Sequence, residues 1–531
     1  MRILLILLLV IASATVQARQ LTTEQKLNDL NELVAMIKGG YGPLEYKKSN
    51  YGIDINKLNA KYTKLISESK NNSEFYYHVI KFVAEFNDSH FGARIPTDHK
   101  GTLGFSTDLI DGKVLIEKVD REKLTKEVFA FEKGDEVISL NGIPVEKIMN
   151  ELMPFMGQGA KVTARRKAAT LVSNRYGSIV PVQDGKLKVK IRKGSSEFIE
   201  EVELEWILSG TPLDEYISQI KNLGQRFSLG KTNYSNISLI KDPTFERSYQ
   251  CSGNTRVKIP EDATIIMKKP FVAYYHKTEK GNIGYLRIPH YSPSESDPSL
   301  NAYELRFAQY EYAVSELEKN TVGLIIDQDH NCGGSVSYLH QIVSLFALKP
   351  FAPVQFELLA TKQSYLGFKS WMNKTYEYTI DYQDGQNVVD LIKDTWLNKS
   401  SFLTEKTSLS GKTSIEPNQT HYTKPIIILI DENSGSGGDA FPATMQGIGR
   451  AKLLGTRTMG AGGHVIKLPA LSNSQINVNM TKSLFYHPNS VAIENNGATP
   501  DIEYRHTRDD FIYEYRGYQK FYLNELFKLI K

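Results

Sequence analysis

The chain has little cysteine, no long hydrophobic run after its N-terminus and no concentration of charge of one sign. Only two cysteines, Cys251 and Cys332, occur in 531 residues, which excludes a disulfide-rich scaffold. No Cys/His group has the spacing of a zinc site. The 64 basic and 60 acidic residues are spread along the chain and leave a net charge of +4, which argues against a nucleic-acid-binding surface. We therefore expect no nucleic-acid partner, no metal and no other cofactor.

The most apolar segment lies at the N-terminus. Met1 and Arg2 precede an apolar run over residues 3–12, and Val16-Gln17-Ala18 is typical of a cleavage site. The run is too short to span a bilayer, and no later segment is long and apolar enough to do so. We expect a signal peptide over residues 1–18 and a protein exported to the periplasm or the cell exterior, with no membrane span.

The next three segments differ in their hydrophobic patterning. Residues 19–97 have apolar side chains at helical spacing and predict a helical N-terminal domain. Residues 98–210 contain short apolar runs and the dipeptide Asn141-Gly142, which is typical of a hairpin turn between strands. Residues 211–280 are weakly patterned, and we expect a connector with some strand content.

From residue 281 to residue 531, apolar strands alternate with amphipathic helices. Short buried strands are predicted over 283–288, 322–327 and 425–431, each followed by a helix, with an insertion at about 350–420. This alternation predicts a largely parallel sheet with right-handed crossovers. The fold class expected for the whole chain is therefore multidomain α/β.

Two glycine-rich turns each follow a predicted strand and open a helix. The first runs from Asp327 to Ser335 and the second from Asn433 to Asp439. Open α/β sheets bind ligands at this carboxyl edge, and a helix N-terminus offers unpaired N–H groups that can stabilise an oxyanion. Ser436 is therefore a candidate nucleophile. The alternative is an ordinary helix cap formed by Ser436 and Asp439.

Two strings in residues 98–210 resemble the PDZ domain signature. One runs from Lys133-Gly134-Asp135 to Asn141-Gly142, and the other is Leu103-Gly104-Phe105, at the place where such domains have a loop that binds a chain-end carboxylate. The resemblance implies a PDZ-like β domain. It also implies that a peptide or unfolded protein substrate binds there by its C-terminus, through backbone N–H groups and an added strand.

The glycine-rich turns are similar to two segments of the tail-specific, or C-terminal-processing, serine peptidase family. The first matches that family's Asp-x-Arg-x-Asn-x-Gly-Gly segment, and the second matches its nucleophile segment. The resemblance covers most of the chain in domain order, and it implies a ClpP/crotonase-like α/β spiral core. Members with a Ser–Lys dyad have a lysine where this chain reads Gly460-Ala461-Gly462-Gly463, so a lysine base is missing.

The tricorn core protease branch of the same family resembles this chain more closely. Its Ser-x-Gly-Asp turn matches Ser436 to Asp439, its Ser-His pair matches Ser89-His90, and its Glu-Asn-x-Gly-x-x-Pro-Asp segment begins at Glu494 here. The resemblance implies that Ser436 is the nucleophile and His90 the general base. Ser89 and Glu494 would form the supporting relay, and a neutral imidazole oriented in this way suits proton transfer near pH 7.

The oxyanion hole is assigned to the backbone N–H groups of Gly333 and Gly437, with Gly334 as an alternative to Gly333. The alternative for His90 is a structural histidine without a catalytic role. The alternative for Glu494 is a turn carboxylate, also without a catalytic role. Fallback bases are His464 and Lys467, and His330 is expected to be exposed. Two other functions stay open beside an exported serine peptidase. One is a non-catalytic ligand- or peptide-binding protein, and the other is an acyl-group hydrolase on the related core.

Overall fold

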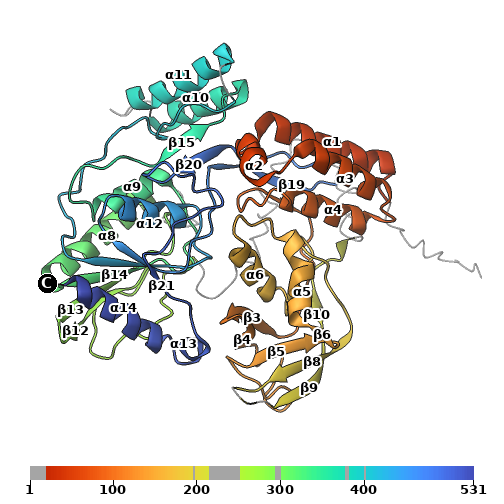
Figure 1. Ribbon diagram of the computed structural model, residues 1–531, viewed down its shortest axis with the longest axis horizontal. Coiled ribbons are helices and arrows are strands. Elements are labelled where there is room, and N and C mark those ends of the chain that lie inside the picture. The colour runs from red at the N-terminus through yellow and green to blue at the C-terminus, as the bar shows by residue number, and fades with distance from the viewer. Residues whose placement is uncertain are drawn as a thin grey trace, which may run out of the picture.

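The computed structural model describes residues 20–194, 196, 198–213, 251–292, 300–376, 382–399 and 402–530. The predicted signal peptide and most of the predicted connector, residues 214–250, lie outside the described residues. Helices of the N-terminal domain and a small β domain lie one above the other, and both face a larger α/β core (Figure 1). The predicted multidomain α/β fold class is confirmed.

The N-terminal domain is helical, as its periodicity predicts. Its apolar stripe packs around Leu30, Leu33 and Ile37, and a capping box between Thr22 and Gln25 begins the first helix. The helices are α1 (Thr23–Gly40), α2 (Leu44–Tyr51), α3 (Ile55–Ser67) and α4 (Asn72–Ala84).

A three-stranded antiparallel sheet joins this domain to the core. Strand β1 (Gly92–Arg94) begins two residues after His90 and pairs with β19 (Asn477–Thr481), which pairs in turn with β18 (Val465–Lys467). One face of this sheet packs into the helical domain's core. The segment that carries His90 is therefore held to the C-terminal half of the chain by main-chain hydrogen bonds.

The β domain is built on a sheet in the order β3-β4-β5-β8-β9, with a short strand β6 on β5. Asn141 and Gly142 both have positive φ, 49° and 76°, so the predicted hairpin turn is confirmed. Helices α5 (Val145–Leu152) and α6 (Lys161–Thr170) follow, with the short helix η1 (Met153–Phe155) between them. The strands are β3 (Phe105–Ile110), β4 (Lys113–Val119), β5 (Glu136–Leu140), β6 (Ile143–Pro144), β8 (Lys186–Arg192) and β9 (Ile199–Glu205). A separate sheet contains β10 (Ile207–Ser209), β2 (Lys100–Thr102) and β7 (Asn174–Tyr176).

The core contains a seven-stranded sheet in the order β11-β12-β13-β14-β16-β17-β21. The run from β13 to β21 is parallel, as predicted, and β11 to β13 are antiparallel. Helices α8, α9 and α12 cover one face of the sheet, and α14 covers the other. The strands are β11 (Thr264–Met267), β12 (Ala273–Thr278), β13 (Gly281–Arg287), β14 (Gly323–Asp327), β16 (Ile426–Ile430), β17 (Lys452–Gly455) and β21 (Ile502–Glu503). The helices are α8 (Leu300–Asn320), α9 (Val336–Ser344), α12 (Gly437–Gly447), α13 (Arg508–Ile512) and α14 (Arg516–Leu529).

Two segments belong more closely to the core than their patterning indicates. Strands β11 and β12, from the predicted connector, extend the core sheet. The predicted insertion contains β15 (Gln355–Leu358), which pairs with β20 (Ser483–Tyr486), and the helices α10 (Lys362–Tyr376) and α11 (Tyr382–Asn398). Pairing with distant strands is invisible to local periodicity, which explains both differences.

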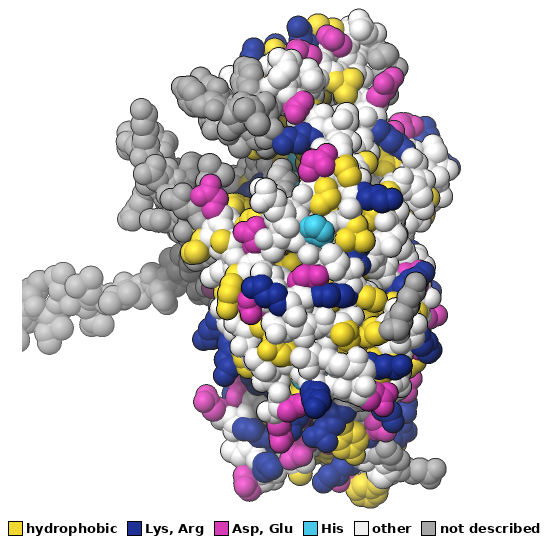
Figure 2. Space-filling model, turned by 90° about the vertical axis from the view of Figure 1, so that its left-hand side faces the viewer, with side chains coloured by type: hydrophobic (Ala, Val, Ile, Leu, Met, Phe, Trp, Pro, Cys, Tyr) yellow, Lys and Arg dark blue, Asp and Glu magenta, His cyan; other side chains and the backbone are white. Residues whose placement is uncertain are grey.

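The surface carries charges of both signs. Figure 2 shows basic and acidic side chains interspersed over one face of the molecule. Within the part of the chain that the structure describes, no helix combines the length and the apolar character needed to cross a bilayer. A disulfide joins Cys251 to Cys332, the two cysteines of the chain.

Candidate active site

Ser436 lies in a strained turn between β16 and α12. Its φ of 60° and ψ of −114° place a non-glycine residue in a sparsely populated backbone region, and α12 begins at the next residue. Asp439 accepts the Ser436 N–H, so the capping box of the alternative is present, although the Ser436 backbone is not extended as in an ordinary N-cap residue. A strand-to-helix turn of this kind exposes a serine hydroxyl at the carboxyl edge of the sheet, as the nucleophile turn of α/β-hydrolases does.

The buried carboxylate of Asp439 holds this turn in place. It accepts hydrogen bonds from the backbone N–H of Ser436 at 2.7 Å, of Gly460 at 2.8 Å and of Ala461 at 3.0 Å. The hydroxyl of Thr458 also donates to it. Burial raises the pKa of Asp439 to about 6, although these hydrogen bonds lower it. Asp439 therefore links the turn that carries Ser436 to the loop at residues 460–463. In the family that this chain resembles, members with a Ser–Lys dyad have their lysine in that loop.

Gly333 packs directly against the nucleophile turn. A Cβ atom at this residue would lie 2.6 Å from the Cβ of Ser436 and 2.8 Å from the backbone N of Gly437, and its φ is +74°, so only glycine fits. Its own N–H donates to Asn331 Oδ1 at 2.8 Å. Among the described residues, the N–H of Gly437 has no hydrogen-bond partner. In this conformation only the second of the two predicted oxyanion donors is available.

His330, beside this turn, is buried and not exposed, so the expectation for it is wrong. Its ring Nδ1 contacts the Asp431 carboxylate, and its backbone N–H donates to the same carboxylate at 2.8 Å. Burial and the nearby Arg256 guanidinium lower the pKa of His330 well below its usual value. The residue belongs to the support beneath the turn and does not line the cavity.

The loop that carries His90 is held by Asp88. One oxygen of this buried carboxylate accepts the backbone N–H of His90 at 2.8 Å, and the other accepts the hydroxyls of Tyr41 and Thr481, each at 2.8 Å. Because Thr481 belongs to the C-terminal half of the chain, Asp88 adds a side-chain link to the β1–β19 pairing. Burial lowers the pKa of His90, and the Asp88 charge offsets only part of this effect. The imidazole is therefore neutral at pH 7.

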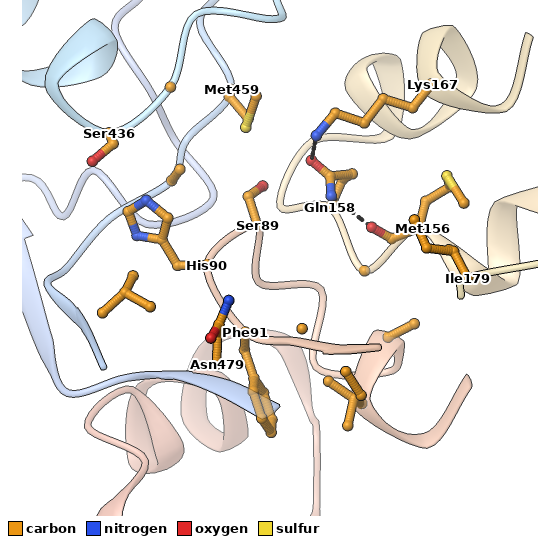
Figure 3. Close-up of a pocket in the computed structure, with 18 of the residues that line it drawn as sticks. Ser89, His90, Phe91, Met156, Gln158, Lys167, Ile179, Ser436, Met459 and Asn479 are labelled. Atoms are coloured by element: carbon orange, nitrogen blue, oxygen red, sulfur yellow. Dashed lines mark hydrogen bonds between the residues drawn. The ribbon is translucent and has the colours of Figure 1, made fainter. Parts of the chain in front are cut away.

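Ser436, His90 and Ser89 line one cavity with a volume of about 290 Å³. Figure 3 shows the Ser436 side chain close to the His90 ring, with Ser89 on the next position of the same loop. The Nδ1 atom of His90 has no hydrogen-bond partner, and no hydrogen bond joins His90 to Ser436 within the described ranges. Residues more than 300 positions apart in the sequence are thus brought to one cavity by docking of the helical domain on the core.

Glu494 lies behind this cavity and is fully buried. Its side chain forms an ion pair with Lys47 of α2 and accepts the backbone N–H of Gly462 at 2.9 Å. Burial and the Asp88 charge raise the pKa of Glu494 to about 8, while Lys47 lowers it. Ser89 Oγ accepts the N–H of Gly159 at 3.2 Å. The Ser89 hydroxyl and the Glu494 carboxylate therefore have different hydrogen-bond partners.

Lys47 is a further residue beside the site that the sequence pattern does not predict. Its side chain is fully buried, and its ammonium group also donates to the backbone oxygen of Asn87 at 2.8 Å and to the side chain of Asn495. It thus joins the loop before His90 to the segment that carries Glu494. Nothing in the polar sequence of α2 distinguishes it from an exposed lysine, because its partners come from distant parts of the chain.

The two fallback bases lie in different environments. His464 contacts Phe368 edge-on, with ring centroids 5.9 Å apart, and burial lowers its pKa to about 4. Lys467 is exposed on β18. Neither side chain lines the cavity. The described residues contain no group of three or more His, Cys, Asp or Glu side chains that could hold a metal ion.

A buried arginine joins the β domain to the nucleophile turn. Arg166 on α6 makes two hydrogen bonds with Asp108 on β3, both 2.9 Å long, and one of 3.2 Å with Asp431 at the end of β16. The Thr107 hydroxyl adds a 2.7 Å hydrogen bond to the backbone oxygen of Ala169. These contacts join α6 to β3 within the β domain and link both to the end of β16.

Comparison with known proteins gives matches to two domain families and to several relatives. Residues 282–504 match the model of peptidase family S41, and residues 99–217 match that of the PDZ domain. A Chlamydia muridarum protein is 25% identical to this chain, covering 99% of it and 96% of its own length. A carboxy-terminal-processing protease of Bartonella bacilliformis is 32% identical over 95 residues, 18% of this chain and 21% of its own.

The same fold occurs in a solved structure. Mature CPAF complexed with lactacystin superimposes with a TM-score of 0.78 at 23% identity, over 96% of this chain and 99% of that one. Helical domain, β domain and core therefore share one architecture with that protein. The chain is thus a serine-type peptidase whose residues 282–504 match family S41, with a match to the PDZ domain before them.

Proposed function

We propose that the protein hydrolyses peptide bonds through an acyl-enzyme formed on Ser436, with His90 as the general base. The observation that carries the proposal is the shared cavity of these two side chains, one on a strained turn and the other a neutral imidazole. A serine hydroxyl is a weak nucleophile until a neighbouring base takes its proton. Neutral His90 supplies that base at pH 7.

The reaction follows from this arrangement. Ser436 Oγ attacks the peptide carbonyl carbon while His90 takes its proton, and the imidazolium then protonates the leaving amine. Water attacks the acyl-enzyme with His90 again as base. The backbone of Gly463 hydrogen-bonds to the His90 ring. Because Nδ1 has no partner, we assign this bond to Nε2–H, which leaves Nδ1 as the proton acceptor. Catalytic hydrogen bonds such as Ser436 to His90 often tighten only when substrate binds.

Glu494 supports the base through the backbone in this proposal. It accepts the N–H of Gly462, and the adjacent Gly463 contacts the His90 ring. The carboxylate therefore orients the imidazole through one peptide unit and not by direct contact. A complete oxyanion hole also requires the Gly333 N–H to turn away from Asn331 when substrate binds, and glycine permits such a rotation.

The substrate class proposed is an extended peptide or unfolded protein. A cavity of about 290 Å³ is small even for a single-ligand pocket, so a folded domain does not enter it. Binding of a chain end at Leu103-Gly104-Phe105 would require the bridge between Arg166 and Asp108 to open. We also propose export by the signal peptide. The Cys251–Cys332 disulfide supports it, because disulfides persist in oxidising compartments.

A peptide library cut by the purified protein tests the proposal. We expect mass spectrometry to show cleavage by the unmodified protein, at least a thousandfold loss in Ser436→Ala and His90→Ala, and near-normal cleavage in the control His464→Ala. Loss in Ser436→Ala with retention in His90→Ala would show that the base is misassigned. Thermal melting of each variant separates loss of chemistry from loss of fold.

A second candidate function is peptide binding without catalysis. The observation that favours it is the Gly333 N–H, which Asn331 occupies, so that the oxyanion site is incomplete in this conformation. Equal peptide affinity of the unmodified protein and Ser436→Ala, with no cleavage by either, would select this alternative.

A further inference from the structure

Asn479 presents its side-chain amide to the cavity that holds Ser436 and His90. The residue lies on β19, is exposed, and is among the residues that line this cavity. Figure 3 shows its side chain below the His90 ring, with the amide end turned toward the loop of Ser89 and His90. Within the described ranges, this amide forms no hydrogen bond with another group of the protein. It is therefore available to a bound molecule.

The other side-chain amides among the described lining residues are each held by the protein itself. Asn331 donates to a backbone oxygen at 2.7 Å and accepts a backbone N–H at 2.8 Å. Gln158 donates to a backbone oxygen at 2.6 Å and accepts a lysine ammonium group at 2.8 Å. Asn433 Nδ2 lies 3.0 Å from a ring nitrogen of His330. These amides are committed before a substrate binds, whereas Asn479 keeps its donors and its acceptor for a ligand.

The sheet fixes the place of this amide. Successive side chains of a strand face opposite sides, and the two neighbours of Asn479, Val478 and Met480, pack into the core of the helical domain. Asn479 therefore faces the other way, toward the cavity. Thr481 lies on the same side of β19 and donates to the buried carboxylate that holds the His90 loop. The amide thus stands on the same rigid face as a support of the proposed base.

Open space lies beside the Asn479 amide. Asn479 is paired across the sheet with Gly92 of β1, which also lines the cavity. A Cβ atom at Gly92 would meet nothing within 4 Å. The missing side chain leaves room for the backbone of an extended peptide next to the amide, because only a glycine lets another chain approach so closely.

We propose that Asn479 binds a backbone amide of the substrate and so positions the peptide between Ser436 and His90. Its Oδ1 accepts a peptide N–H, and its Nδ2 donates to a peptide oxygen. A carboxamide has the same kinds of donor and acceptor as a peptide group, so this contact holds the chain whatever its side chains are. The inference rests on the proposed peptidase function and adds a residue that holds its substrate.

Ester substitution in the peptide tests the contact one bond at a time. Replacing a backbone amide by an ester removes one N–H and changes the shape of the peptide little. The probe is the member of the peptide library that Ser436→Ala binds most tightly, measured by fluorescence anisotropy. We expect an ester at one position to weaken binding to Ser436→Ala about tenfold, an effect of about 1.4 kcal/mol. The same ester should not weaken binding to Ser436→Ala/Asn479→Ala, because the acceptor is already absent.

Further variants separate this contact from a structural role. Asn479→Asp keeps an acceptor oxygen, so the ester effect should persist in it. In the cleaving protein, Asn479→Ala should raise KM about tenfold with little change in kcat, because the contact forms on binding and persists through the reaction. Asn477→Ala is the matched control. Asn477 lies two residues away on the same face of β19 and is not among the described residues that line the cavity, so this variant should keep normal KM and the full ester effect.

The two kinds of measurement separate this inference from the proposed reaction. If the unmodified protein cuts no peptide but the ester effect depends on Asn479, the contact stands and the proposed reaction fails. If the peptide is cut but no ester weakens its binding, or each ester weakens it equally with and without the Asn479 amide, the reaction stands and the contact is overturned. A fall in kcat with unchanged KM in Asn479→Ala would also overturn it, since that pattern indicates a disturbed His90 loop. So would failure of every library peptide to bind Ser436→Ala.

Discussion

Lys47 of the helical domain and Glu494 of the core form an ion pair in which neither side chain is exposed to solvent. Removing two charges from water is costly, and their mutual attraction offsets this cost only when both stay in place. The pair joins the loop that carries His90 to the segment beside it in the core. Docking of the helical domain therefore sets both the position of the proposed base and the charge of the proposed supporting carboxylate.

The pH dependence of activity should report on this pair. Burial and Asp88 raise the pKa of Glu494 to about 8, and Lys47 lowers it, so Lys47→Met should raise this pKa further. Because the proposed mechanism needs ionised Glu494, kcat/KM should increase with pH as Glu494 loses its proton. The midpoint of this increase should lie near pH 8 in the unmodified protein and at higher pH in Lys47→Met. At pH 7, each unit by which the pKa of Glu494 rises should reduce activity about tenfold. Lys47→Arg should keep the midpoint closer to that of the unmodified protein, and an unchanged midpoint in Lys47→Met would contradict the assignment.

Asp439 is expected to matter for both stability and catalysis. Asp439→Ala leaves four buried donors without their acceptor, among them the backbone N–H of Ser436. The free energy of unfolding should fall by about 2–4 kcal/mol, measured by urea denaturation. We expect kcat to fall about a hundredfold, because the nucleophile turn loses its anchor. Asp439→Asn retains one acceptor oxygen and should give smaller effects. Full activity in Asp439→Ala would show that the turn keeps its shape without this carboxylate.

Arg166 should stabilise the docked PDZ domain more than its exposed neighbour does. Arg166→Met leaves Asp108 and Asp431 buried without their partner and should lower the free energy of unfolding by about 3–5 kcal/mol. Arg165→Met is the matched control, because Arg165 pairs with Glu146 at the surface and should contribute less than about 1 kcal/mol. Urea unfolding of both variants gives the comparison, and equal losses would refute the buried network.

Gly92 offers a way to block the cavity without disturbing the fold. It lines the cavity, and a Cβ atom at this residue would meet nothing within 4 Å. Gly92→Leu should therefore extend a side chain into open space and reduce kcat/KM at least tenfold, while the melting temperature stays within a few degrees. Gly39→Leu, at an equally open site on the surface of α1, should leave cleavage unchanged. Normal cleavage by Gly92→Leu would mean that substrate does not pass this strand.

Local patterns in the sequence predicted much of the fold. Helical spacing located α1 and α4, and near-continuous apolar runs located β14 and β16, because burial of one stripe or of both faces leaves a periodic record in the chain. Strands β11 and β12 were assigned to a connector instead. Their place in the core sheet depends on pairing with β13, and pairing partners leave no local signal.

The candidate site, like the fold, was predictable from local sequence only in part. The glycine-rich turn around Ser436 and the Ser89-His90 pair are visible as strings, because a tight turn restricts which residues can follow one another. Whether Ser436 and His90 share a cavity depends on how the helical domain docks on the core. The expected exposure of His330 was wrong for a related reason, since Asp431 and Arg256 enclose it from other segments.

The sequence alone contains the local requirements of this protein: the periodicity of its helices and strands, the glycines that its turns need, and the absence of a lysine near residue 461. The charges that surround the site come from tertiary structure. Lys47, Asp88, Arg166 and Lys167 act on groups that lie far along the chain or in other domains. Electrostatic interactions depend on distance and burial in three dimensions, and neither quantity is recorded in the order of the residues.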